Sequence, residues 1–331
     1  MSISSLRLAG SVVLALCAAF ALAACQKGDP RAPFTDSQIP PGLQSRFYPP
    51  DGWAWGLVKI GKAPAARYGV ASPPRRPRAD VMILAGYGEP AETWFETARD
   101  LNDQGYVVWV LEPVGQGGSG RYALPRDVGD APTLAPDIAG AKALAAGAIH
   151  RRPLVVIASG AAARAAGAAA ESGLASEGLI LSSPAFTPPD AGQPWRREAP
   201  DDHARGLTHD ARRGKLALAW QTANPDLRMG GPDHRWRKAF GKAATAALGG
   251  AGGISTPMLL LQPAGGDAAA AAMCRRLARC QAQSFGPAGS DLQLEVDEVR
   301  AAWLKAVIAF TEADIARFAP PPPQARLAPE G

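Results

Sequence analysis

Histidine is scarce in this sequence, and its distribution is uneven. Only four of the 331 residues are histidines, and none follows His234. Three of them, His203, His209 and His234, lie in one polar segment, but their spacing fits no standard zinc pattern. We therefore predict no metal site and no cofactor. Imidazole is the side chain whose ordinary pKa suits proton transfer near neutral pH. The sequence therefore offers no histidine after residue 234 that could act as a general base.

The N-terminal apolar run is too short for a comfortable transmembrane helix. It covers residues 12–24, follows a single positive charge at Arg7, and ends in the tetrapeptide LAAC at Cys25. This arrangement predicts a signal peptide over residues 1–24. Its end resembles a bacterial lipobox, which implies cleavage before Cys25 and acylation of that cysteine. With Gln26 next, the resemblance implies a lipid anchor in the outer membrane, facing the periplasm. The alternative is an ordinary signal peptide that contains a cysteine.

Four cysteines occur in the chain, and two of them belong to the N-terminal region. Once the signal is removed and Cys25 is acylated, Cys274 and Cys280 remain. An oxidising envelope permits these two to form a disulfide. Their spacing within an expected helix suits two buried free thiols equally well, so both alternatives stay open.

Composition predicts a globular protein with a sizeable core, since 47% of the residues are hydrophobic and 20% are charged. The formal net charge is +5. Outside the cytoplasm, a basic protein meets anionic lipid headgroups before it meets nucleic acid. The sequence contains no recognisable nucleic-acid-binding motif, so we expect no nucleic-acid partner. We expect the protein to contact a membrane through its lipid anchor.

Apolar runs and helical spacings alternate along most of the chain. Strands are expected at residues 53–60, 66–71, 81–85, 106–111, 154–157, 178–181, 257–262 and 282–285. Helices are expected at residues 91–102, 137–149, 273–278 and 299–318. The first two strands should pair antiparallel. Strands that alternate with helices indicate parallel βαβ units, so the predicted fold class is α/β with a mostly parallel, doubly wound sheet.

The alternation of strands and helices is interrupted at both ends of the chain and once in the middle. Residues 25–50 are rich in proline and polar side chains and predict a tether. The α/β core is expected at residues 51–186 and 253–318. Between them, the polar residues 187–252 predict a mostly helical cap or lid, and residues 319–331 form a proline-rich tail.

Four segments, in this order, resemble the motifs of one enzyme group. They are residues 84–94 (LAGYGEPAETW), 110–121 (VLEPVGQGGSGR), 224–232 (NPDLRMGGP, followed by Trp236) and 291–300 (DLQLEVDEVR). They are similar, respectively, to an oxyanion loop, a glycine-rich loop after a strand, a lid segment and the segment that carries the catalytic base. The chain thus resembles the serine aminopeptidase, lysophospholipase and monoacylglycerol lipase branch of the α/β-hydrolases.

This resemblance implies an α/β-hydrolase fold with a helical lid and the hydrolysis of carboxylic esters. Such a reaction needs a serine, an aspartate and a histidine in that chain order, together with two backbone amides that stabilise the oxyanion. The resemblance implies that Asp267, after a predicted strand, is the acid, and that the amides of Tyr87 and Ala161 are the oxyanion donors.

The other two catalytic positions depart from the family pattern. No strict G-x-S-x-G occurs, and Gly160 occupies the position of the nucleophile in Ala-Ser-Gly-Ala-Ala. Ser290 occupies the position of the base. A side chain in the strained turn of such a nucleophile costs on the order of 1–3 kcal/mol, and glycine escapes that cost. The substitution abandons the chemistry and relieves the strain.

Three hypotheses follow. The first is a catalytically impaired pseudo-hydrolase that binds a lipid, an acyl ligand or an envelope partner. The second is an active carboxylic-ester hydrolase with a non-standard site, in which Ser159 is the nucleophile and a lid histidine is the base. The third is a scaffolding lipoprotein with a filled pocket. The double substitution at Gly160 and Ser290 favours the first.

Overall fold

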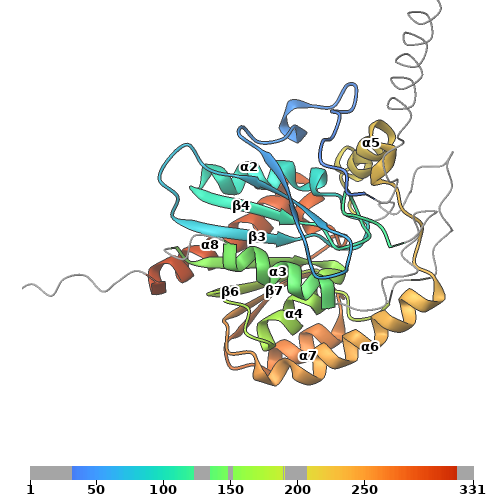
Figure 1. Cartoon of the computed structure of the whole chain (residues 1–331). Helices are drawn as coiled ribbons and strands as arrows, with labels where there is room; N and C mark the ends of the chain where they lie inside the picture. Colours follow the sequence, from blue (N-terminus) through green and yellow to red (C-terminus); the bar gives the residue numbers. More distant parts are fainter. Residues whose placement is uncertain (1–31, 123–134, 148–151, 189, 191–206, 319–331) are drawn as a thin grey trace, which may run out of the picture.

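The computed structural model describes residues 32–122, 135–147, 152–188, 190 and 207–318, and its centre is one eight-stranded sheet (Figure 1). The strands are β1 (Ala54–Val58), β2 (Ala66–Ala71), β3 (Ala79–Leu84), β4 (Tyr106–Leu111), β5 (Leu154–Ser159), β6 (Gly178–Ser182), β7 (Met258–Pro263) and β8 (Cys280–Phe285). Their order is β1-β2-β4-β3-β5-β6-β7-β8. Only β1–β2 and β2–β4 pair antiparallel. The predicted doubly wound, mostly parallel sheet is confirmed.

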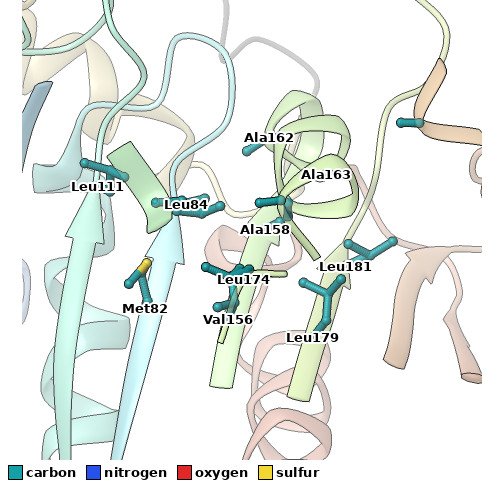
Figure 2. Packing of buried hydrophobic residues seen from close by; sticks show 14 of the residues in the cluster. Met82, Leu84, Leu111, Val156, Ala158, Ala162, Ala163, Leu174, Leu179 and Leu181 are labelled. Atoms are coloured by element: carbon teal, nitrogen blue, oxygen red, sulfur yellow. The ribbon is translucent and has the colours of Figure 1, made fainter. Parts of the chain in front are cut away.

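Helices cover both faces of this sheet, which explains why its central strands are apolar throughout. One face carries α3 (Ala135–Gly147), α4 (Ala163–Glu171) and α7 (Ala268–Arg276), and the other carries α2 (Phe95–Asp103) and α8 (Asp297–Phe318). Figure 2 shows part of the first layer, in which Leu84, Ala158 and Leu181 stand side by side on three neighbouring strands.

The described part of the expected lid, residues 207–252, is helical. It contains α5 (Leu216–Ala223) and α6 (His234–Gly250), which pack against different parts of the core. On α6, Trp236 and Phe240 join the apolar layer of α4, whereas Trp220 of α5 joins a separate cluster beside α2. The described ranges also contain seven short 3-10 helices: Ser45–Phe47, Ala91–Trp94, Gly160–Ala162, Arg213–Lys215, Pro225–Leu227, Ala251–Gly253 and Leu292–Leu294.

The N-terminal segment of residues 32–50 packs on the domain, so the expected tether is wrong for this part. Phe47 is buried, and it joins Trp220 in the cluster beside α2. The backbone N–H of Gln38 donates to the side chain of Asn224 (2.7 Å), whose amide donates back to the Gln38 carbonyl (2.9 Å). Apolar and hydrogen-bonding side chains in a proline-rich segment explain the difference.

The remaining parts of the predicted organisation stay predictions. The signal peptide, Cys25 and the proline-rich tail lie outside the described residues. Among the helices that the structure does describe, none is long and apolar enough to cross a membrane.

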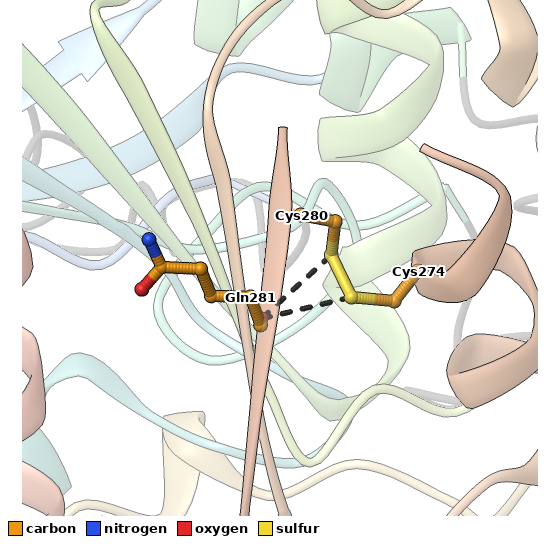
Figure 3. Close-up of a disulfide and its surroundings, with 3 residues drawn as sticks. All are labelled: Cys274, Cys280 and Gln281. Carbon is orange, nitrogen blue, oxygen red and sulfur yellow. Dashed lines mark hydrogen bonds between the residues drawn. A yellow bond between two sulfur atoms is a disulfide. The ribbon is translucent and has the colours of Figure 1, made fainter. Parts of the chain in front are cut away.

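Cys274 and Cys280 form a disulfide, with their Cα atoms 5.3 Å apart (Figure 3). The two cysteines do not share one helix, which corrects the sequence-based expectation. Helix α7 begins at Ala268 and ends at Arg276, and the chain then turns into β8, which starts at Cys280. The turn brings the end of the helix back beside the start of the strand.

A buried ion cluster joins β2 to the loops that follow β3 and β4. The guanidinium of Arg67 donates to Glu112 (2.7 Å) and to Glu92 (2.9 Å), and all three side chains are 0% exposed. Burial alone would lower the pKa of Arg67, but the two carboxylates outweigh burial and raise it. Glu112 also accepts the backbone N–H groups of Ala91 (2.8 Å) and Gly118 (2.9 Å). One cation therefore fixes both loops.

We expect Arg67→Met to destabilise the domain by about 3–5 kcal/mol, because it leaves two buried carboxylates without their cation. Guanidinium unfolding followed by tryptophan fluorescence measures this loss. The matched control is Arg78→Met, which removes an ion pair whose arginine and glutamate side chains are 49% and 38% exposed. The control should cost less than about 1 kcal/mol. Equal losses in the two variants would contradict a structural role for the cluster.

Candidate functional site

The turn after β5 has the backbone of a strained elbow. Ser159 is the last residue of the strand, and Gly160 follows with φ of +46°, in the left-handed region that favours glycine. A Cβ built on Gly160 would meet nothing closer than the Oε1 atom of Glu89, at 4.0 Å. The site therefore has room for a small side chain at position 160, and backbone strain is the cost of placing one there.

The surroundings of Ser159 disfavour it as a nucleophile. Its side chain is buried, and the hydroxyl donates to Oε1 of Glu89 at 2.7 Å. A serine whose proton is engaged by a carboxylate within the core has neither an open approach for a carbonyl carbon nor an imidazole to receive its proton. Ser159 remains the fallback nucleophile of the second hypothesis, with geometry that disfavours it.

Glu89 lies at the centre of this region, and the sequence reasoning missed it. Its carboxylate accepts from the backbone N–H of Gly86 (2.9 Å), from Nε1 of Trp94 (3.1 Å) and from Ser159. Burial raises the pKa of Glu89, and these hydrogen bonds oppose the rise. The signal was available, because Glu89 belongs to the motif at residues 84–94.

A second buried acid, Asp291, accompanies Glu89. Burial raises the pKa of Asp291 well above its usual range, and the negative charges of Glu89 and Glu295 raise it further. Ser290, the predicted position of the base, directly precedes Asp291 and is half-buried. Acidic side chains therefore lie next to both of the positions predicted for the nucleophile and the base.

Asp267, the predicted acid, performs a structural task in the described fold. One carboxylate oxygen accepts the N–H groups of Ala269 (2.8 Å) and Ala270 (3.0 Å) and so caps α7. The other accepts the N–H of Phe186 at 2.8 Å. The residue follows β7 and directly precedes α7, so it comes after a strand as the resemblance implied, but its oxygens hold backbone groups.

The histidines do not supply a base within the described residues. Nδ1 of His209 pairs with Glu295 at 2.8 Å on a side chain that is 60% exposed, and His234 starts α6. Neither of these two hydrogen-bonds a described serine. His150 and His203 lie outside the described residues.

A pocket lies between the sheet and helices α3, α4 and α6. Both predicted oxyanion residues, Tyr87 and Ala161, line it. The Tyr87 ring packs edge-on against Trp236, with ring centroids 4.9 Å apart, and its hydroxyl donates to the Gly230 carbonyl at 2.9 Å. Helix α6 of the expected lid therefore forms one wall of the pocket.

Charged side chains line this mostly apolar pocket as well. They are Glu112, Asp137 and Arg164. Glu112 belongs to the buried ion cluster. Burial raises the pKa of Asp137 to about 6 and lowers the pKa of Arg164 to about 9. Each of these two charges is thus poorly solvated.

A mostly parallel sheet with a sharp turn after β5, an acid after β7 and helices over both faces defines an α/β-hydrolase. The sequence profile of the serine aminopeptidase family S33 matches residues 75–283, and the chain belongs to that family. No curated protein sequence matches the chain.

Solved structures of hydrolases resemble this fold at low sequence identity. A soluble variant of monoglyceride lipase from Saccharomyces cerevisiae, in complex with a substrate analog, is 14% identical, with 84% of this chain and 99% of that chain covered and a TM-score of 0.62. The monoacylglycerol lipase of Paleococcus ferrophilus is 14% identical, with coverage of 75% and 98% and a TM-score of 0.58. A carboxyl esterase from Bacillus coagulans, in complex with glycerol, is 14% identical, with coverage of 80% and 99% and a TM-score of 0.58.

We expect Asp291→Asn to stabilise the protein at neutral and alkaline pH but not at pH 4. An acid whose pKa is raised in the folded state binds its proton more tightly there than in the unfolded chain. Stability is therefore lost as the pH rises above the ordinary pKa of about 4. Asparagine removes this loss. Thermal unfolding should show a gain of at least about 2 °C at pH 8, the shift that ~1 kcal/mol produces in a domain of this size.

The control for this experiment is Asp297→Asn. Arg213 lowers the pKa of Asp297 through a hydrogen bond and its charge. Loss of that carboxylate should lower the melting temperature at pH 8, the opposite sign. An Asp291→Asn variant that is less stable than the wild type at pH 8 would contradict the buried acidic pair.

Proposed function

We propose that this protein is a catalytically impaired hydrolase that binds a lipid or acyl ligand in the pocket behind Tyr87 and Ala161. The observation that carries the proposal is Gly160, which occupies the strained turn after β5 without any side chain. Acyl transfer by this family's route begins when a hydroxyl loses its proton to a neighbouring base. The turn keeps its shape and lacks that hydroxyl.

The surrounding residues support the same conclusion. Ser159 is bonded to Glu89, and the oxygens of Asp267 hold backbone N–H groups. A serine at position 290 cannot act as a general base near neutral pH. The binding part of the site is better preserved, since an apolar pocket with an aromatic wall from α6 remains. The substrate analog in the related monoglyceride lipase structure supports a lipid-like ligand for such a pocket.

The location is part of the proposal: the bacterial outer membrane, with the protein facing the periplasm and anchored through acyl chains on Cys25. The lipobox-like end of the signal supports this. The disulfide between Cys274 and Cys280 adds an independent argument, because disulfides persist in oxidising compartments and are rare in the cytosol.

We expect the wild-type protein to resist a fluorophosphonate probe, which labels only activated serines, and to hydrolyse neither monoacylglycerols nor p-nitrophenyl esters. The matched variant, Gly160→Ser with Ser290→His, restores both side chains, and position 160 has room for the serine. Labelling of this variant would indicate that the remaining groups are still arranged for catalysis. Labelling of the wild type that disappears in Ser159→Ala would overturn the proposal in favour of an active hydrolase.

We expect Cys25→Ser to abolish the incorporation of labelled palmitate into the protein in a bacterial host. The proposed anchor consists of acyl chains on Cys25, and serine offers no thiol to begin the acylation. The control is Cys17→Ser, which lies within the predicted signal and should leave palmitate incorporation unchanged. Palmitate incorporation that persists in Cys25→Ser would contradict the lipid anchor.

A further inference from the structure

Arg164 places a buried positive charge in the wall of the pocket. It stands in the first turn of α4, four positions after Gly160, and its side chain is buried. Its guanidinium carbon lies 3.2 Å from the centroid of the Phe240 ring and 5.9 Å from that of Trp236. An arginine between two aromatic rings of α6 is an unusual lining for a pocket that would otherwise accept only apolar chains.

The hydrogen bonds of Arg164 leave its charge unpaired within the described residues. Nε donates to the Ala161 carbonyl at 3.0 Å, and Nη1 donates to the Phe240 carbonyl at 3.4 Å. Both acceptors are neutral, and further N–H donors of the guanidinium are left over. No described carboxylate lies within 4.0 Å of the guanidinium nitrogens. A buried cation without an ion-pair partner is costly unless another group compensates its charge.

The two acids of the pocket do not provide that compensation at contact distance. Glu112 is committed to Arg67. Asp137 attracts Arg164 through its charge, but its Oδ1 accepts the N–H of Val114 at 2.9 Å, and the two side chains form no ion pair. Among the residues that the structure describes, Arg164 is therefore the cation of this pocket that still lacks an anion at contact distance.

We propose that the pocket binds a carboxylate-bearing amphiphile, a free fatty acid, with its carboxylate on Arg164 and its chain against Trp236, Phe240 and the apolar residues of α3 and α4. A neutral ester would leave the guanidinium uncompensated, whereas a carboxylate pairs with it through charge-assisted hydrogen bonds. This assignment rests on the proposed ligand-binding function and specifies the chemistry of the ligand.

The test is calorimetric titration of the full acylated chain in lipid nanodiscs, with empty nanodiscs as the blank. The probes share one chain length: octanoate, octyl phosphate and 1-monooctanoylglycerol. Octanoate should bind at least tenfold more tightly than the monoacylglycerol. Arg164→Gln should remove this preference, whereas Arg164→Lys, which keeps the charge, should retain most of it.

Two further variants separate electrostatics from folding. Asp137→Asn removes the nearby negative charge and keeps an acceptor for Val114, so it should tighten octanoate binding more than it changes monoacylglycerol binding. Arg152→Gln is the matched control, because Arg152 is also an arginine beside a buried aspartate, Asp80, but precedes β5 at the opposite end of the strand from the pocket. It should leave the binding of both probes unchanged.

The outcomes distinguish this inference from the function on which it rests. Equal binding of octanoate and monooctanoylglycerol, unaffected by Arg164→Gln, would overturn the carboxylate assignment and leave the lipid-binding function standing. Tighter binding of octyl phosphate than of octanoate would overturn the carboxylate in favour of a phosphate headgroup. Binding of none of the three probes would contradict both the assignment and the proposed function.

Discussion

The contact of Arg67 with two buried carboxylates determines where the loops of the site lie. Glu112 accepts two backbone N–H groups. One belongs to Ala91, just after the oxyanion-like loop, and the other belongs to Gly118 in the glycine-rich loop. The fit is tight: a Cβ at Gly117 would overlap Glu112, and one at Gly118 would overlap Arg67. These glycines are therefore required by the ion cluster itself, whether or not the protein catalyses a reaction. The proposed loss of the nucleophile would therefore not relax the need for these two glycines.

The same reasoning explains how an α/β-hydrolase site can lose its chemistry and keep its shape. Asp267 caps α7 and holds the N–H of Phe186, so its carboxylate stabilises the fold without any histidine to orient. Glu89 binds the Trp94 indole and the Ser159 hydroxyl and so joins the loop after β3 to the end of β5. Under the proposed function, Gly160 and Ser290 stand where such enzymes have their serine and histidine, and the described fold keeps its shape without those side chains.

Much of this could be predicted from the sequence, and the failures have physical causes. The alternation of apolar runs and helices predicted the sheet, because both faces of its central strands are covered. The buried pair of Glu89 and Asp291 escaped prediction, since their distance in the sequence hides that the chain brings them together. The packing of residues 32–50 was missed because proline-rich composition indicates an extended chain but not what its few aromatic residues contact. Arg164 went unnoticed because its alanine-rich helix gives no sign of the aromatic rings that α6 supplies.

The packing of the N-terminal segment on the domain limits how far the domain can lie from a lipid anchor at Cys25. Phe34 donates its backbone N–H to the carbonyl of Gly118 at 2.7 Å. Gly118 belongs to the glycine-rich loop, whose Gln116 lines the pocket. With acyl chains on Cys25, the chain from the lipid to residue 32 spans at most about 25 Å when fully stretched. That reach is shorter than the thickness of a bilayer. Under the proposed lipid anchor, the rim of the pocket would be held close to the headgroups, and the membrane would be its nearest reservoir of amphiphiles.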